Sequence, residues 1–551
     1  MLPPCQILAW GFLFFPRYYI LADEMENQSY LKIGRAAEIV ESRERRIYRF
    51  LEILPALLSW LTLFGVIFFS WALPVFTAVF IIAFDVYWFF KTIFLSLHMR
   101  SAFGKMKANL KKNWLNELET VHVESKELSG CNWRDIYHLV ILPMYQETLG
   151  VARSGFESLT KVNYPSDRLI VILAIEGRAV QHGSEQSGED ALAIAAKIKE
   201  EFGGKFFKFL ITTHPADTFG EIAGKGSNET WAIKETKNKV IDELKIPYEK
   251  IIVSVFDVDT ITHHDYFGRL THAYLSSEKP LRSSFQPIPL FVNNIWQAPA
   301  FARIFAFSTT FWQMIQQSRP ERLITFSSQS IGFKPLSDVG FWQTNVVSED
   351  SRIFWQCLLH FDGDWQTIPM FFPIYMDANV APTFWQTIKN QYKQIQRWSY
   401  GVENNAYFLY GFSKNKKISK NKKWHLSFVM MEGAHSLATN ALIIFMLGWL
   451  PTVIGSGKFG ETLLSYNLPY VTRLIMTFAM VGLIFIAIIA INLLPPKPPK
   501  YGKFKYILMI IQWLLLPVNM IIFGSIPALD AQTRLALGKY LGFWNTPKVR
   551  K

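Results

Sequence analysis

The sequence predicts an α/β domain inserted between membrane-spanning helices. Half of the 551 residues are hydrophobic, only 18% are charged, and the net charge is +13 at pH 7. Average soluble domains carry a charged share of about 25%. High hydrophobicity together with a basic excess is typical of membrane proteins with basic inner loops, and this composition rules out a disordered chain. Three scattered cysteines argue against a disulfide framework.

The hydrophobic residues gather toward the two ends of the chain. Residues 54–71 and 75–97 each approach the roughly 20 apolar residues that cross a bilayer, so they predict a transmembrane hairpin. Residues 428–450 and 474–494 predict two further spans. The last apolar run, 506–526, is interrupted by Pro517. A single crossing and a re-entrant hairpin both remain open for it.

Basic residues flank the predicted spans. Because basic loops stay in the cytoplasm, the large middle section is predicted to face the cytoplasm, from a plasma (inner) membrane. The tail 531–551 is also basic, which conflicts with a single crossing by the last apolar run. The N-terminal run 7–21 is predicted to be an interfacial or buried helix rather than a signal peptide. The basic residues of the flanks are Arg43, Arg45, Arg46, Arg49, Arg100, Lys105, Lys107, Lys111, Lys112, Lys497, Lys500, Lys503 and Lys505.

The middle section alternates short apolar runs with helical patterns, which is typical of a parallel sheet with crossover helices. In such sheets ligands bind beyond the carboxyl ends of the strands. The predicted strands are 137–142, 169–175, 206–212 and 251–256, and the predicted helices are 190–202 and 227–244.

Three polar motifs follow these elements. Asp257 and Asp259 come directly after a predicted strand, and alternate carboxylates there can hold Mg²⁺ or Mn²⁺ against a diphosphate. A D-x-D pair alone is equally a solvated turn before a helix. Later come Ser348-Glu349-Asp350 and Gln394-Ile395-Gln396-Arg397-Trp398. In the latter, Gln394, Arg397 and Trp398 share one face of a helix.

In their order and spacing, these motifs resemble those of the family 2 glycosyltransferases, in particular the membrane-integrated branch of cellulose, chitin and hyaluronan synthases. The resemblance covers residues 139–400 by motif and the flanking spans by architecture. It implies a cytoplasmic, Rossmann-like GT-A domain and an inverting enzyme of the hexosyltransferase type. The expected partners are a UDP- or GDP-sugar donor, Mg²⁺ or Mn²⁺, a saccharide or lipid acceptor and the bilayer, with no nucleic acid.

The resemblance also implies roles on the donor side. Tyr145 and Glu147 would contact the nucleotide base, with the tyrosine ring stacked on it. Lys225 would lie near the nucleotide, where an ammonium and the amides of a helix start suit a phosphate. Asp257 and Asp259 would hold the metal, with Asp259 as the direct ligand. Glu176 stands where the family has an aspartate that contacts the base, so its role and the choice of base stay open.

On the acceptor side, Asp350 is the expected general base, which takes the proton from the acceptor hydroxyl, and Glu349 would orient it. The alternative for Asp350 is an ordinary helix N-cap. Gln394, Arg397 and Trp398 would bind the acceptor and the diphosphate: Arg397 would grip the departing diphosphate, and Trp398 would stack on a sugar ring. A helix lying on the membrane surface is a competing or additional explanation of this segment. Trp385, Trp398 and Tyr400 are expected to cluster where this helix meets the active site, so that these aromatic residues serve as sugar platforms as well as membrane anchors.

Three functions fit the sequence. The favoured one is a processive polysaccharide synthase that threads its product through its own helices. The first alternative is a single-sugar transferase acting on a polyprenyl phosphate or a glycolipid, and the second is a transporter or scaffold with a degenerate transferase domain. The predicted segments are 1–50 N-terminal, 51–98 transmembrane hairpin, 99–375 catalytic domain, 376–424 interfacial helices, 425–530 transmembrane helices and 531–551 basic tail.

Overall fold

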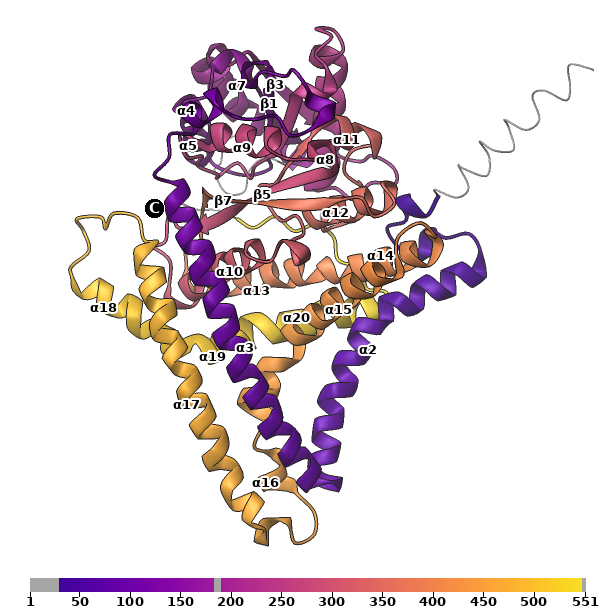
Figure 1. The fold of residues 1–551 in the computed structure, drawn as a ribbon, viewed down its shortest axis with the longest axis vertical. Coiled ribbons are helices and arrows are strands. Elements are labelled where there is room, and N and C mark those ends of the chain that lie inside the picture. Colours follow the sequence, from indigo (N-terminus) through magenta and orange to yellow (C-terminus); the bar gives the residue numbers. More distant parts are fainter. Residues whose placement is uncertain (1–28, 183–189, 548–551) are drawn as a thin grey trace, which may run out of the picture.

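The computed structural model describes residues 29–182 and 190–547. The N-terminal run 7–21 and the basic residues 548–551, for which the sequence analysis made predictions, lie outside the described residues. An α/β domain stands at one end of a group of long helices (Figure 1). The predicted combination of an α/β domain with apolar helices on both sides of it in the sequence is therefore confirmed.

The domain contains a seven-stranded sheet with the order β3-β2-β1-β4-β6-β5-β7. The four predicted strands pair in parallel, as expected. The expectation of a wholly parallel sheet is wrong at β6, which runs antiparallel to β4 and β5. Ser327, shortly before β6, lies at the edge of the sheet where β4 ends. The chain therefore starts β6 at the end of β4, and β6 runs in the opposite direction to β4. The strands are β1 Tyr137–Met144, β2 Leu169–Glu176, β3 Lys208–His214, β4 Ile251–Val255, β5 Ser283–Phe291, β6 Ser330–Gly332 and β7 Gln366–Met376.

Helices cover both faces of this sheet. Alternate residues of β1 point into two separate cores: Val140 packs into one cluster, and Leu139 and Ile141 pack into the other. A strand that is buried on both faces consists of a nearly continuous run of apolar residues. This is why β1, β2 and β4 could be recognised in the sequence. The covering helices include α5 Leu149–Thr160, α7 Ala191–Phe202, α8 Lys225–Thr236, α9 Tyr266–Leu275 and α12 Glu349–His360.

Four described helical segments are long and apolar enough to cross a membrane: Ser42–Ala72, Pro74–Asn109, Lys420–Leu447 and Phe504–Ala536. The first two are α2 and α3, and they form the predicted hairpin with its turn at Leu73. Helix α3 continues past residue 98, where the apolar run ends, because Met99, Ala102 and Met106 are buried against the α/β domain. Helix α17, Leu463–Asn492, contains all but the last two residues of the predicted span 474–494 and runs alongside α3 (Figure 1).

The last apolar segment lies across the other long helices, beneath α10 (Ala300–Gln317) and α13 (Phe384–Ser399) (Figure 1). At one end Tyr506 packs on Trp296 of the α/β domain, with ring centroids 5.5 Å apart. At the other end Arg49, near the start of α2, donates a hydrogen bond to the carbonyl of Leu535 (2.8 Å). Both ends therefore lie on the domain side, and so does the tail that follows. The segment comprises α18 Phe504–Ile511, α19 Leu516–Met520 and α20 Ile526–Ala536.

Candidate functional site

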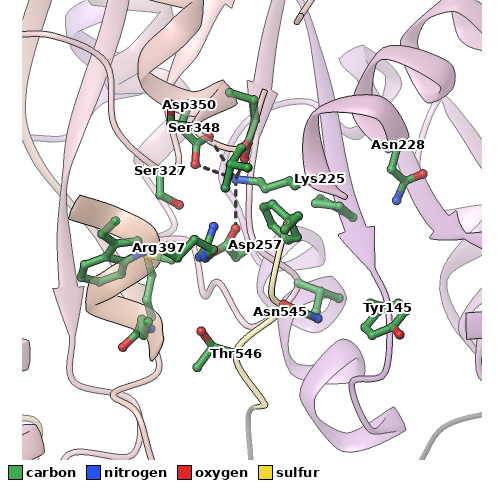
Figure 2. Close-up of a pocket in the computed structure, with 18 of the residues that line it drawn as sticks. Tyr145, Lys225, Asn228, Asp257, Ser327, Ser348, Asp350, Arg397, Asn545 and Thr546 are labelled. Atoms are coloured by element: carbon green, nitrogen blue, oxygen red, sulfur yellow. Dashed lines mark hydrogen bonds and ion pairs between the residues drawn. The ribbon is translucent and has the colours of Figure 1, made fainter. Parts of the chain in front are cut away.

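A single cleft brings together residues from all the predicted motifs (Figure 2). It lies beyond the carboxyl ends of β1, β2 and β4. Helices cover both faces of the sheet, so the loops that follow these strands are the part of it that a ligand can reach. Nearly every predicted site residue lines it, and the exception is Asp259. The lining includes Tyr145, Glu147, Glu176, Lys225, Asp257, Glu349, Asp350, Gln394, Arg397 and Trp398.

Lys225 joins two of the motifs. Its Nζ lies 3.0 and 3.1 Å from the two carboxylate oxygens of Asp350 and 3.1 Å from Oδ1 of Asp257 (Figure 2). Burial alone would lower the pKa of Lys225, but Asp257, Asp350 and the glutamates nearby raise it well above its usual range. The lysine is therefore a fixed cation between the D-x-D loop and the S-E-D turn.

The glycines around Lys225 are explained by close packing. A Cβ on Gly226 would come within 2.9 Å of the Glu349 side chain, and one on Gly224 within 2.6 Å of Phe543. Any larger side chain would push α8 away from α12 or from the C-terminal segment. These contacts bring the first turn of α8 close enough for Lys225 to reach Asp350.

Asp350 does not act as a helix cap. Helix α12 begins at Glu349, so the N-cap position belongs to Ser348. The turn is held by Glu403 of α14 (Glu403–Lys414), whose Oε1 accepts hydrogen bonds from the backbone N–H groups of Val347 (3.0 Å) and Ser348 (2.9 Å) and from the Ser348 hydroxyl (2.7 Å). The carboxylate of Asp350 is thereby left to face the cleft. Sequence reasoning missed Glu403, which has no motif spacing to mark it.

Glu349 lies behind Asp350 and is almost fully buried. Its Oε1 is 3.9 Å from Nζ of Lys225. Burial, with a further contribution from Asp350, raises the pKa of Glu349 to about 8. Burial therefore favours the acid form of Glu349, and Asp350 is the more accessible of the two carboxyl groups of the motif.

Asp259 is fully buried below the cleft wall. Its Oδ2 accepts a hydrogen bond from the backbone N–H of Asp377 (3.0 Å), and its carbonyl accepts one from Asn293 (3.2 Å). Asp377, which the sequence analysis did not select, lines the cleft, as Asp257 does. Carboxylate oxygens of this kind are the donors that Mg²⁺ and Mn²⁺ prefer, so the residues present fit a divalent ion at this edge.

An aromatic ring and two carboxylates form the far end of the cleft. The backbone N–H of Tyr145 donates a hydrogen bond to Glu147 Oε2 (2.8 Å). The guanidinium of Arg178 lies 5.2 Å from the Tyr145 ring centroid and pairs with Glu176. Burial raises the pKa of Glu176, and Arg178 partly offsets the effect. A flat ring beside hydrogen-bond acceptors suits a nucleobase that offers N–H donors.

Trp398 lies in an aromatic group at the opposite end. Its ring centroid is 6.1 Å from that of Phe291, 5.8 Å from Phe305 and 5.7 Å from Phe326. A second, smaller hollow continues beyond Trp398 between α10 and α13. Its polar lining includes Thr309, Asn379, Gln391 and Gln394.

The expected cluster of three aromatic sugar platforms is not observed. Trp385 is 76% exposed at the start of α13, and Tyr400 is buried in a separate cluster with Val347 and Val402. Only Trp398 of the three lines the cleft. One helix face cannot bring Trp385 and Trp398 together, because the two residues stand at opposite ends of α13.

The C-terminal segment forms part of the cleft wall. Phe543, Asn545 and Thr546 line it, and Arg397 lies over the Phe543 ring at 4.7 Å. The amide of Asn545 donates a hydrogen bond to Glu147 Oε1 (3.2 Å). These residues were missed because a contact between Asn545 and the loop that follows the first strand leaves no local pattern.

No family model and no curated protein matches the sequence. Solved structures with a similar fold include the mannosyltransferase PcManGT from Pyrobaculum calidifontis in complex with GDP-Man and Mn²⁺, at 13% identity and a TM-score of 0.36, over 75% of this chain and 99% of that one. Another is S. aureus TarS 1-349 in complex with UDP-GlcNAc, at 12% identity and a TM-score of 0.29, over 63% of this chain and 90% of that one. At such low similarity, the interpretation of the cleft rests on its own residues.

Proposed function

We propose that this protein is a membrane-embedded inverting glycosyltransferase of family 2, with a cytoplasmic GT-A-type domain and a UDP- or GDP-sugar donor. The observation that carries the proposal is the position of Lys225 between Asp257 and Asp350 in one cleft. The donor-side and acceptor-side motifs, far apart in the sequence, converge there with Arg397 and Trp398. The basic flanks of α2 and α3 support the cytoplasmic orientation.

Asp350 is the general base of the proposed reaction. Its carboxylate takes the proton of the acceptor hydroxyl, and that oxygen forms a bond to the anomeric carbon. The bond from the anomeric carbon to the diphosphate oxygen breaks on the opposite face, so the configuration inverts. The proton remains on Asp350, and the nucleoside diphosphate departs with the electron pair.

Cationic groups of the cleft receive the leaving diphosphate. Lys225 and Arg397 reach the cleft from α8 and α13, and the N-terminus of α8 adds backbone amides. A bound Mg²⁺ or Mn²⁺ would neutralise diphosphate charge, and Asp257 and Asp377, which line the cleft, are the residues that would hold it, with Asp259 buried behind them. Tyr145, Glu147 and Glu176 would bind the nucleotide base at the far end of the cleft.

The acceptor end favours a processive synthase. The hollow between α10 and α13 beyond Trp398 is lined by rings and amides, which are the groups that contact sugars, but its space of about 10 Å³ suits a single water molecule. A single-sugar transferase acting on a lipid would use the same catalytic residues and would need no exit for a saccharide. We propose that the growing saccharide leaves the cleft at this hollow, where α10 and α13 would have to move apart to admit it.

The test uses purified full-length protein with radiolabelled UDP- and GDP-sugars in Mn²⁺, Mg²⁺ or a chelator. The proposal predicts metal-dependent release of nucleoside diphosphate and a long saccharide that stays bound to the enzyme. A labelled product that extracts into organic solvent as a monoglycosylated lipid would refute processivity. Absence of turnover with every donor would instead favour a transporter or scaffold.

A further inference from the structure

Glu229 is a carboxyl group buried directly beneath the cleft. It lies on α8, four residues after Lys225, and is 0% exposed. Among the described residues, neither of its oxygens has a hydrogen-bond partner, and its ion-pair contact is with Nζ of Lys225, at 3.7 Å from Oε1. Burial raises the pKa of Glu229 well above its usual range, and a buried carboxyl group with so few partners costs stability in either protonation state. Packing alone does not explain its presence.

The position of Lys225 explains what such a group does. Lys225 is the first residue of α8, where the partial positive charge of the helix terminus repels a cation. Side chains at i and i+4 lie on the same helix face, so Glu229 reaches Lys225 from below. Asp257 and Asp350 reach the same ammonium from the cleft. Lys225 is thus held from two sides.

Glu229 differs from the other carboxyl groups around this lysine. Asp257 follows β4, and Glu349 and Asp350 belong to α12, so each can shift relative to α8 when a donor or acceptor enters. Glu229 shares the helix of Lys225, and its distance from the lysine is set by that helix alone. Among the carboxyl contacts of Lys225 described above, it is the one that does not depend on how α8 sits against another element.

We propose that Glu229 is a positioning residue that holds the ammonium of Lys225 between Asp257 and Asp350. Glu229 lines no part of the cleft and acts only through Lys225. The consequence for catalysis rests on the proposed transferase function, in which Lys225 receives the donor diphosphate. The placement of Lys225 itself does not depend on that function and can be measured separately.

The test replaces Glu229 in the full-length protein. Glu229→Leu removes the polar group at similar volume, whereas Glu229→Gln keeps a polar oxygen beside Lys225. Glu235→Leu is the matched control, because Glu235 pairs with Lys239 at the same i,i+4 spacing on the outside of the same run of helix. Glu229→Met repeats the measurement if Glu229→Leu does not fold.

The first readout is the rate at which an amine-specific reagent modifies Lys225, followed by mass spectrometry without any donor. We expect Lys225 to be modified about threefold faster or more in Glu229→Leu, because a lysine side chain without this contact moves into the cleft and meets the reagent more often. The rate should stay near the wild-type value in Glu229→Gln and be unchanged in Glu235→Leu. A wild-type rate in Glu229→Leu would overturn the proposal, whether or not the protein is a transferase.

The second readout is the donor KM in nucleotide release. We expect a rise of about fivefold or more in Glu229→Leu, at an unchanged melting temperature, with most of the loss restored in Glu229→Gln. Partial unfolding would lower the apparent kcat and leave KM unchanged, so a KM effect separates positioning from stability. A wild-type KM in Glu229→Leu would also refute the proposal. If the wild-type protein shows no turnover, the transferase function is refuted. The labelling experiment then still decides whether Glu229 positions Lys225, because it needs no donor.

Discussion

The side-chain amide of Asn545 donates a hydrogen bond to Glu147 Oε1 across 3.2 Å, although 398 residues separate the two in the sequence. This contact brings the C-terminal segment to the loop that follows the first strand. Five residues earlier, Tyr540 also anchors the segment, because its hydroxyl donates a hydrogen bond to Glu52 Oε2 of α2 (2.9 Å). This C-terminal segment, with Phe543, Asn545 and Thr546, is therefore part of the cleft wall.

We expect Asn545→Ala to weaken donor binding. Glu147 would lose a hydrogen bond, which is worth about 1 kcal/mol, so the donor KM should rise about fivefold at unchanged kcat. Lys539→Ala is the control, because Lys539 is exposed in the same segment. An unchanged KM in Asn545→Ala would show that this segment covers the cleft without helping to bind the donor.

Trp398 and Trp385 offer a matched pair on one helix. Trp398 contacts three phenylalanine rings and lines the cleft, whereas Trp385 is 76% exposed. Trp398→Ala should raise the concentration of acceptor needed for half-maximal rate about tenfold, with an unchanged donor KM, because stacking on the sugar is lost. Trp385→Ala should behave as wild type. Equal effects of the two substitutions would place the acceptor elsewhere.

The C-terminal tail should be reached from the same side of the membrane as the α/β domain. In a protein without its native cysteines, Lys539→Cys and Lys234→Cys should both react with an impermeant thiol reagent added from the cytoplasmic side. Leu463→Cys, at the start of α17, should react only from the other side. Lys539→Cys reacting together with Leu463→Cys would show that the last apolar segment crosses the membrane.

His138 predicts a pH dependence of stability. Burial holds its pKa at about 3, below the ordinary value of 6.5, and its Nε2 lies 2.7 Å from Oγ1 of Thr271. Between these values the unfolded chain binds the extra proton, so stability is lost as the pH falls below 6.5. We expect the wild type to lose about 2 kcal/mol more than His138→Gln between about pH 7 and pH 5. The exposed His122→Gln should keep the wild-type slope, and an equal slope in His138→Gln would contradict the account.

The sequence predicts the sheet only where its strands are uninterrupted apolar runs. Strands β5 and β7 escaped recognition because each contains prolines: Pro287 and Pro289 in β5, and Pro369 and Pro373 in β7. Proline within a run argues against a strand. The sheet accommodates these residues because β7 is its edge strand and β5 has an irregular register between Gln286 and Ile288.

In the candidate site too, the residues that a local pattern marks were predicted and the others were not. Residues in motifs, such as Asp257, Asp350 and Trp398, could be selected from spacing, and the fold brings them into one cleft. Glu403 and Asn545 could not be selected, because each acts through a contact distant in sequence. Asp259 was selected as a direct metal ligand, but it is buried below the cleft wall, where it accepts a hydrogen bond from the backbone of Asp377, just after β7, and no local pattern reports this contact.

The most direct test of the central claim compares the wild type with Asp350→Asn. The substitution keeps the shape of the side chain and its contact with Lys225 but removes the proton acceptor. We measure nucleoside diphosphate release under saturating donor and acceptor, and donor binding by calorimetry in the same preparations. The account predicts that the rate falls by about 100-fold or more while donor affinity stays within about threefold of wild type. An Asp350→Asn protein that turns over at the wild-type rate would contradict it.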